Sequence, residues 1–157
     1  MKWIVNLLSA DNNSNFILNN DSGGQMLIKY TQEDHSVSID SPQKIKRTYF
    51  QEHYGILTNG FLFRNEYGVE IGKMARNMWN KEKGYIQLYH RRFFYNIKKI
   101  GTKIGLTVFD NRKMKVCETE IKPEEIQESN AGIINEYSGI LFSVCWFLTE
   151  TAFSAEI

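Results

Sequence analysis

The feature that most constrains the fold of this chain is an uncharged, apolar segment near its C-terminus. No Asp, Glu, Lys or Arg occurs from Tyr137 to Thr149, and apolar residues fall at every angle of a helical wheel. Such a segment predicts a helix, over about residues 133–153, that is buried on all sides. A membrane span needs roughly 20 apolar residues, and Glu136 and Glu150 bracket this shorter run. We therefore expect the helix to lie in the core of a soluble domain.

Most of the preceding chain alternates apolar and polar residues with a period of two, which is typical of half-buried β-strands. The clearest alternating segment follows Asn59-Gly60, a pair that favours a hairpin turn. A later aromatic segment, residues 85–100, changes parity near Arg91-Arg92, where we expect a turn or a bulge. The apolar residues of the clearest segment are predicted to face the core together: Phe61, Phe63, Tyr67, Val69 and Ile71.

A wholly apolar helix in a chain otherwise made of strands has few places to go. The simplest is the inside of a closed sheet, which also leaves no unpaired strand edge. We predict one mainly β domain over residues 1–157, a closed antiparallel β-barrel around a central C-terminal helix. The alternative is an open curved antiparallel sheet with the helix packed on one face.

Two short segments of the chain resemble each other. Residues 16–23 and residues 61–68 both contain a strand, an Asn-acid pair and a glycine that precedes the next strand. An internal duplication would produce this similarity. Ordinary hairpin turns would also produce it, because they favour Asn, Asp and Gly at these places. The sequence alone leaves both interpretations open.

The order of these elements resembles the tubby-like superfamily, which includes the tubby C-terminal domain, the phospholipid scramblases and the LURP-one-related proteins. The resemblance is strongest over residues 61–73, Phe-Leu-Phe-Arg-Asn-Glu-Tyr-Gly-Val-Glu-Ile-Gly-Lys. As a pattern it covers most of residues 14–153, through the aromatic segment 85–97 and the apolar helix. It implies a barrel of about twelve strands around a central helix.

The same resemblance bears on function. Some tubby-like domains bind phosphoinositides through basic side chains, and scramblases associate with membranes, so the resemblance implies an anionic lipid as a partner. The proline-rich N-terminus and the cysteine-rich stretch of the scramblases are missing from this sequence. Their absence argues against scramblase activity.

Positive and negative charges are segregated along the chain, although its net charge is only +1. Residues 73–115 carry a net charge of +10, whereas residues 1–72 carry −2 and residues 116–157 carry −7. Segregation of this kind is typical either of a surface made for an anion or of two faces that neutralise each other. Aromatic residues lie between the cations of the basic segment.

From this basic segment we predict a non-enzymatic binding module for an anionic partner, with a phospholipid or phosphoinositide headgroup as the first candidate. Phosphates bind clustered cations through Coulomb attraction and charge-assisted hydrogen bonds. The alternative is a solvated outer face, partly paired with the acidic C-terminal segment. The candidate binding residues are Lys73, Arg76, Lys81, Lys83, Arg91, Arg92, Lys98, Lys99 and Lys103.

Other functions remain open. A protein–protein interaction or scaffold role would use the basic and acidic faces for self-association or for a protein partner. A small-ligand carrier or an enzyme would need a pocket inside the barrel, which the apolar helix should instead fill. Nucleic acid is disfavoured because nucleic-acid-binding domains are usually strongly basic, and this chain is close to neutral.

No catalytic residue, metal site or cofactor is predicted. The three histidines are far apart in the sequence and show no ligand spacing with the two cysteines. Cys117 adjoins Glu118, whose charge would raise the pKa of the thiol and make it less nucleophilic. Two cysteines, Cys117 and Cys145, make no disulfide framework, so we expect both to be reduced. This favours a cytoplasmic location, either free or peripheral at a membrane.

Overall fold

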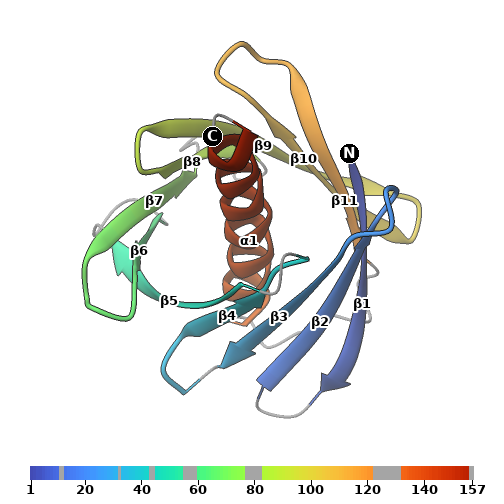
Figure 1. Cartoon of the computed structure of the whole chain (residues 1–157). Helices are drawn as coiled ribbons and strands as arrows, with labels where there is room; N and C mark the ends of the chain where they lie inside the picture. The colour runs from blue at the N-terminus through green and yellow to red at the C-terminus, as the bar shows by residue number, and fades with distance from the viewer. Residues whose placement is uncertain are drawn as a thin grey trace.

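The computed structural model describes residues 1–10, 13–31, 33–42, 45–54, 60–76, 83–121 and 132–155, with most of their side chains. Eleven strands and then one helix follow each other along this part of the chain (Figure 1). They are β1 (Lys2–Ala10), β2 (Asn13–Asn20), β3 (Gln25–Thr31), β4 (Ser36–Asp40), β5 (Lys46–Tyr54), β6 (Gly60–Arg64), β7 (Glu70–Arg76), β8 (Lys83–Leu88), β9 (Arg91–Ile100), β10 (Lys103–Phe109), β11 (Lys115–Ile121) and α1 (Gly132–Ala155).

The strands form a closed barrel in which each pairs antiparallel with its neighbours in sequence. The closing pair, β1 with β11, is parallel, with Lys2 opposite Glu118. Each strand of a meander reverses direction, so the first and the eleventh run the same way and can join only in parallel. The predicted closed, mainly β barrel is confirmed, and the open-sheet alternative is wrong. The described residues form eleven strands, and the resemblance implies about twelve.

Helix α1 runs through the barrel and supplies much of its core (Figure 1). The Phe142 ring stacks on Phe63 of β6 with a centroid distance of 4.1 Å, and meets Tyr49 of β5 edge-on at 4.8 Å. Phe147 meets Trp3 of β1 edge-on at 5.1 Å. Contacts with strands from different parts of the barrel wall confirm the predicted central helix.

The observed helix begins one residue before the predicted range of about 133–153 and ends two residues after it. Two buried hydroxyl groups in its middle are satisfied within the helix itself. Ser143 Oγ donates to the Gly139 carbonyl oxygen at 2.7 Å, and Thr149 Oγ1 donates to the Cys145 carbonyl oxygen at 2.9 Å. These bonds let a polar side chain sit in an apolar core without an unpaired donor.

Three hairpin turns of the barrel share one hydrogen-bonding pattern. They connect β2 to β3, β6 to β7 and β10 to β11, and they begin at Asn20, Asn65 and Asp110, each 45 residues after the last. In each turn the first side chain's Oδ1 accepts bonds from the backbone N–H groups two and four positions later. The equal spacing favours an internal repeat over unrelated hairpins, and adds a third copy to the two seen in the sequence.

The fourth residue of each of these turns has a left-handed backbone conformation. Its φ angle is 82° at Gly23, 76° at Gly68 and 64° at Lys113. Glycine adopts this conformation without a steric penalty, whereas a residue with a Cβ atom does not. The third turn therefore holds a lysine at a position that the other two give to glycine.

One sequence prediction is wrong: Tyr67 and Val69 do not face the core with Phe61 and Phe63. Tyr67 is 86% exposed and Val69 is 57% exposed, whereas Phe61 and Phe63 are buried. The cause is the β6–β7 turn, in which the chain reverses over residues 65–69 and the alternation of faces ceases to apply. Ile71, beyond the turn, is buried as predicted.

The turn predicted near Arg91-Arg92 is confirmed just before that pair. Leu88 pairs with Arg91, so β8 and β9 form a tight hairpin through residues 89–90. The hairpin places Phe93 and Tyr95 in the core and leaves Phe94 37% exposed on the outer surface. Asn59, predicted to start a hairpin with Gly60, lies outside the described residues.

Candidate functional site

Three neighbouring strands of the barrel, β8, β9 and β10, contain six cations and no Asp or Glu. Within them, Lys83, Arg92 and Lys98 are exposed on the outer surface. Cations on adjacent strands add their fields, and no carboxylate on these strands opposes them. The outer surface of these three strands is therefore the most positive part of the barrel wall among the described residues.

The acidic residues of the next strand, β11, form ion pairs with Lys2 and Lys115, which lie outside β8–β10, and with Lys103 of β10. Glu120 pairs with Lys2 of β1 at 2.9 Å and with Lys103 at 3.6 Å, and Glu118 pairs with Lys115 at 2.6 Å. The hydrogen bonds from Lys2 and from Lys115 hold the pKa of Glu120 and of Glu118 below the usual range. Lys103 is thus the one candidate that the described residues pair with the acidic segment.

A groove of about 590 Å³ lies on the outer surface of β8, β9 and β10. Three aromatic side chains form a row across it, because Tyr85 is the cross-strand neighbour of Phe94, and Phe94 that of Phe109. Lys83, opposite Asn96, provides one charged side. The lining residues are Lys83, Gly84, Tyr85, Phe94, Tyr95, Asn96, Phe109 and Lys113.

Glycine at position 84, beside the groove, lets β8 pack closely against Ala75 and Tyr95. A Cβ atom there would collide with the Ala75 carbonyl oxygen and with the hydroxyl group of Tyr95. The Tyr95 side chain is buried and cannot move aside without disturbing the core. A larger residue at position 84 would therefore displace either the strand or the tyrosine.

Arg92 is held at the aromatic side of the groove. Its guanidinium carbon lies 4.5 Å from the centre of the Tyr85 ring, and its Nη2 atom donates to Gln87 Oε1 at 3.2 Å. Lys73 on β7 shares this row, because Gln87 is the cross-strand neighbour of both Lys73 and Arg92. Lys98 lies two residues beyond Asn96 on β9, diagonal to Lys83. The structure thus brings four of the candidate cations onto one surface.

Other candidate residues do not join this surface. Lys99 alternates with Lys98 and is the cross-strand neighbour of the buried Ile104. It therefore belongs to the inward-facing series of β9, on the opposite face of the strand from Lys98. Arg91 turns toward the helix, where its Nη1 atom donates to the Leu148 carbonyl oxygen at 3.2 Å. We assign Arg91 a structural role. The side chain of Arg76 and the whole of Lys81 lie outside the described residues.

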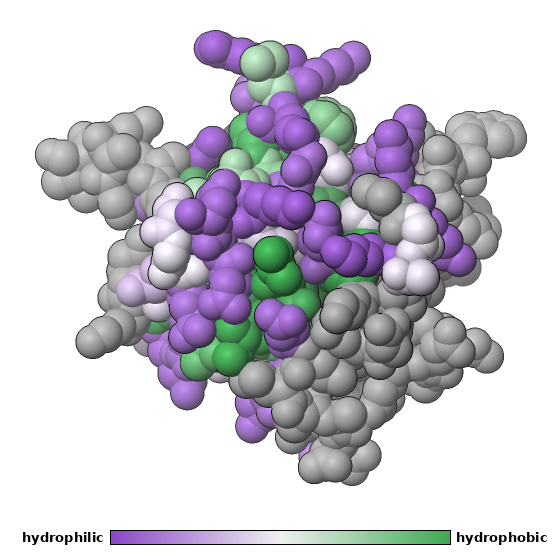
Figure 2. All heavy atoms as spheres, turned by 90° about the vertical axis from the view of Figure 1, so that its right-hand side faces the viewer, coloured by the Kyte–Doolittle hydropathy of each residue, from purple (hydrophilic) through white to green (hydrophobic). Residues whose placement is uncertain are grey.

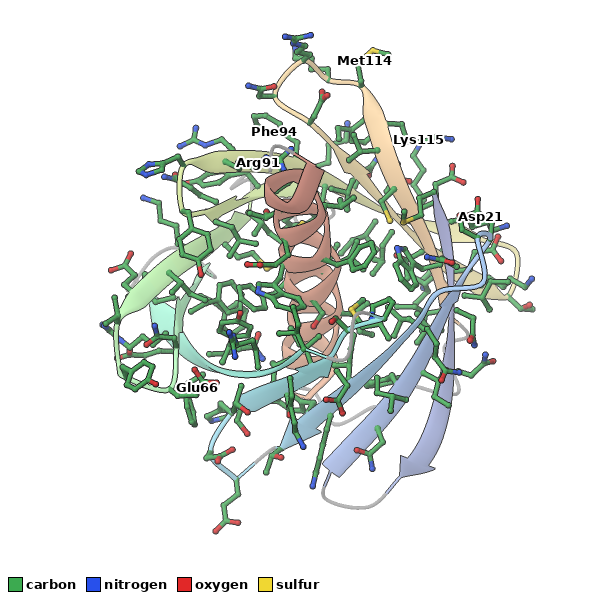
Figure 3. All side chains as sticks on the ribbon, in the orientation of Figure 1. Asp21, Glu66, Arg91, Phe94, Met114 and Lys115 are labelled. Atoms are coloured by element: carbon green, nitrogen blue, oxygen red, sulfur yellow. The ribbon has the colours of Figure 1, made fainter. Side chains whose placement is uncertain are left out.

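Lys113 lines the groove and was missed by the sequence prediction. The sequence Asp110–Lys113 predicts only a turn. The sequence of a turn does not indicate which strands its residues will lie beside. The turn belongs to the long β10–β11 hairpin, whose tip is marked by Met114 in Figure 3. Figure 2 shows the same tip projecting at the top of the molecule, mostly hydrophilic. A comparison of all three turns, at residues 20, 65 and 110, could have singled out the lysine.

The two cysteines are free, as predicted, and both are buried. Burial raises the pKa of the Cys117 thiol to about 12, and Glu118 adds to the rise as the sequence suggests, although burial is the larger cause. Burial also raises the pKa of Cys145. Neither thiol is poised for nucleophilic chemistry. The described residues contain no group of three or more His, Cys, Asp or Glu able to hold a metal ion.

Comparisons with known proteins add nothing to this picture. No family model, no curated protein and no solved structure matches the chain. Among the residues described here, no helix has the length and apolar character needed to cross a membrane. The groove and its charges are therefore the features of the molecule that bear on function.

Proposed function

We propose that this chain is a non-enzymatic binding module for an anionic partner, with a phospholipid or phosphoinositide headgroup as the first candidate. The observation that carries the proposal is the groove on β8–β10, in which an aromatic row lies beside cations on strands free of carboxylates. A phosphate would bind Lys83 and its neighbouring cations through charge-assisted hydrogen bonds. The aromatic row offers contact area to the apolar part of the same molecule.

Exposed apolar side chains near the groove favour a lipid surface over a free phosphate. Phe94 in the aromatic row is 37% exposed, and Met114 at the hairpin tip is 64% exposed. Met114 follows Lys113 and precedes Lys115 in the chain. An apolar side chain between cations suits the boundary between headgroups and acyl chains, where each part finds its own environment.

We also propose that the chain is a member of the tubby-like superfamily. The support is architectural, a closed meander barrel around a single apolar C-terminal helix. The described residues form eleven strands, where the family pattern implies about twelve. A cytoplasmic protein that binds the surface of a membrane would be consistent with membership of this superfamily.

Co-sedimentation with vesicles across a salt series tests the proposed function. We expect the protein to bind vesicles of equal parts phosphatidylcholine and phosphatidylserine and to dissociate from them in high salt. It should not bind vesicles of pure phosphatidylcholine. The variant Lys83→Gln/Arg92→Gln/Lys98→Gln should bind roughly a hundredfold more weakly, since each cation near such a surface is worth on the order of 1 kcal/mol.

A matched control separates the groove from total charge. Lys29, Lys46 and Arg47 are exposed on β3 and β5, away from the groove. The variant Lys29→Gln/Lys46→Gln/Arg47→Gln loses the same charge, and we expect it to keep most of the binding. Equal losses in the two variants, or no binding by the wild type at low salt, would refute the proposal.

A protein–protein interaction or scaffold role is the second candidate. The observation that favours it is the β6–β7 turn, where Tyr67 is 86% exposed and Val69 is 57% exposed. Exposed apolar side chains at a loop tip are a common contact for protein partners. Sedimentation without lipid tests this role. A dimer that Tyr67→Ser dissociates would indicate contact through the turn, whereas a dimer that dissociates in salt would indicate self-association through opposite charges.

A further inference from the structure

The turn between β10 and β11 holds a lysine at its fourth position, where its two counterparts hold glycine. All three turns share the same side-chain and backbone hydrogen bonds. At the fourth position Gly23 and Gly68 take left-handed φ angles of 82° and 76°, and Lys113 takes 64°. The turn thus accepts a conformation that disfavours a side chain, at a place where glycine serves twice elsewhere in the same chain.

The lysine cannot leave this conformation, because Asp110 fixes the turn. Asp110 Oδ1 accepts from the N–H groups of Arg112 and Met114 at 2.9 Å, and the Asp110 carbonyl oxygen accepts from the Lys113 N–H at 3.0 Å. A strained residue that its surroundings hold in place points to a function for the side chain. Lys113 lines the groove together with Lys83.

We infer that Lys113 is an anion-binding residue of the groove, and that the β10–β11 turn keeps a strained lysine there at a cost in stability. The inference rests on the proposed function and deepens it. Lys83 on strand β8 and Lys113 on the turn reach the groove from separate elements. The ligand of the groove is a phosphate ester that binds both lysines. The apolar portion of this ligand lies on the aromatic row that contains Phe94.

The substitution Lys113→Gly separates the two halves of this inference in one variant. We expect it to raise the urea midpoint of unfolding, because the turn gains its preferred residue. We also expect it to weaken binding to the phosphatidylserine vesicles about fivefold, which corresponds to one lost cation. The variant Lys113→Arg should keep both the wild-type affinity and the wild-type midpoint.

Two further variants supply the controls. Arg112→Gln removes the neighbouring charge from the same exposed tip but not from the groove lining, and we expect a smaller loss of affinity. Gly68→Lys places a lysine at the matching position of the β6–β7 turn, and we expect a lower urea midpoint with no gain in binding. Soluble inositol trisphosphate, measured by calorimetry, distinguishes a free phosphate ester from a bilayer lipid, and a loss in Lys113→Gly with either ligand supports the inference.

The outcomes separate this inference from the proposed function. If Lys83→Gln weakens binding but Lys113→Gly binds as the wild type does, the groove stands and the role of Lys113 is refuted. Equal losses in Arg112→Gln and Lys113→Gly would also refute it, since tip charge would then explain both. A lower midpoint in Lys113→Gly would refute the stability cost. Failure of the wild type to bind either ligand would refute the proposed function and this inference together.

Discussion

The Arg92 guanidinium lies over the face of the Tyr85 ring, with 4.5 Å between its central carbon and the ring centre. The same ring lines the groove, so one aromatic side chain both positions a cation and offers apolar surface. A cation over an aromatic face is favoured electrostatically, and it loses fewer of its conformations when a ligand binds. Tyr85 and Arg92 should therefore behave as a unit.

This coupling predicts the effect of Tyr85→Leu, which keeps an apolar side chain but removes the aromatic face. We expect the free energy of unfolding to fall by about 0.5–1 kcal/mol, and binding to anionic vesicles to weaken. Arg92→Gln in the Tyr85→Leu background should then cost less affinity than it costs alone. Additive losses in this double-mutant cycle, measured by vesicle binding, would contradict the coupling. Tyr67→Leu, on an exposed turn, is the control.

Phe142 of α1 stacks on Phe63 and is fully buried, which predicts a large loss on truncation. We expect Phe142→Ala to lower the free energy of unfolding by about 3–5 kcal/mol, because a cavity remains where the ring was. Urea denaturation measures the change. Met114→Ala, at a position 64% exposed, should leave stability almost unchanged. A loss near zero at Phe142 would contradict a helix packed inside the barrel.

The buried thiol of Cys117 predicts a loss of stability at high pH. Its pKa is raised to about 12 in the folded protein, whereas an unfolded cysteine titrates near pH 8.5, so about 8.5 to 12 is the relevant window. Within it the unfolded chain releases a proton that the folded chain keeps, and stability falls as pH rises. The urea midpoint should drop more between pH 8 and pH 10 in the wild type than in Cys117→Ala.

A thiol reagent gives an independent check on both cysteines. The folded protein should react slowly with Ellman's reagent at pH 8, since thiolate is the reactive form and both thiols are buried. Both thiols should react at once in urea. Fast reaction of the folded protein would show that the Cys117 or Cys145 environment is open.

Glu120 pairs with Lys103 and would compete for it with the anionic ligand that we propose. Its Oε2 atom lies 3.6 Å from Lys103 Nζ, and its Oε1 atom lies 2.9 Å from Lys2 Nζ. We expect Glu120→Gln to release Lys103 and to strengthen binding to anionic vesicles. Glu33→Gln removes an equal charge from an exposed turn residue. If both variants strengthen binding equally, overall charge and not Lys103 accounts for the gain.

Period-two alternation predicted burial well within strands and failed where the chain turned. Val37 and Ile39 are fully buried in β4, as their alternation with serines indicates. Tyr67 and Val69 continue the alternation of Phe61 and Phe63 in the sequence. A hairpin turn lies between the two pairs, and both Tyr67 and Val69 are exposed. Periodicity reports the face of a strand only while the backbone remains extended.

The sequence predicted the positive charge of the candidate site but not which residues form it. Alternation indicates that Lys83, Arg92 and Lys98 share the outer face, but the register between strands decides which of them meet. Lys113 lines the groove together with residues of β8 and β9. How far the β10–β11 hairpin reaches relative to these strands depends on the stagger of the closed barrel. That stagger is a property of all eleven strands together and has no local signature.

The parallel seam between β1 and β11 joins Lys2 to Glu118, residues from nearly opposite ends of the strand series. Every other strand pair forms between neighbours in sequence and can assemble as a local hairpin. A nascent chain that has not yet supplied β11 and α1 therefore holds ten strands as an open sheet, with its apolar inner face uncovered and two free edges. For this protein the synthesis of β11 and α1 decides between a closed molecule and one exposed to aggregation.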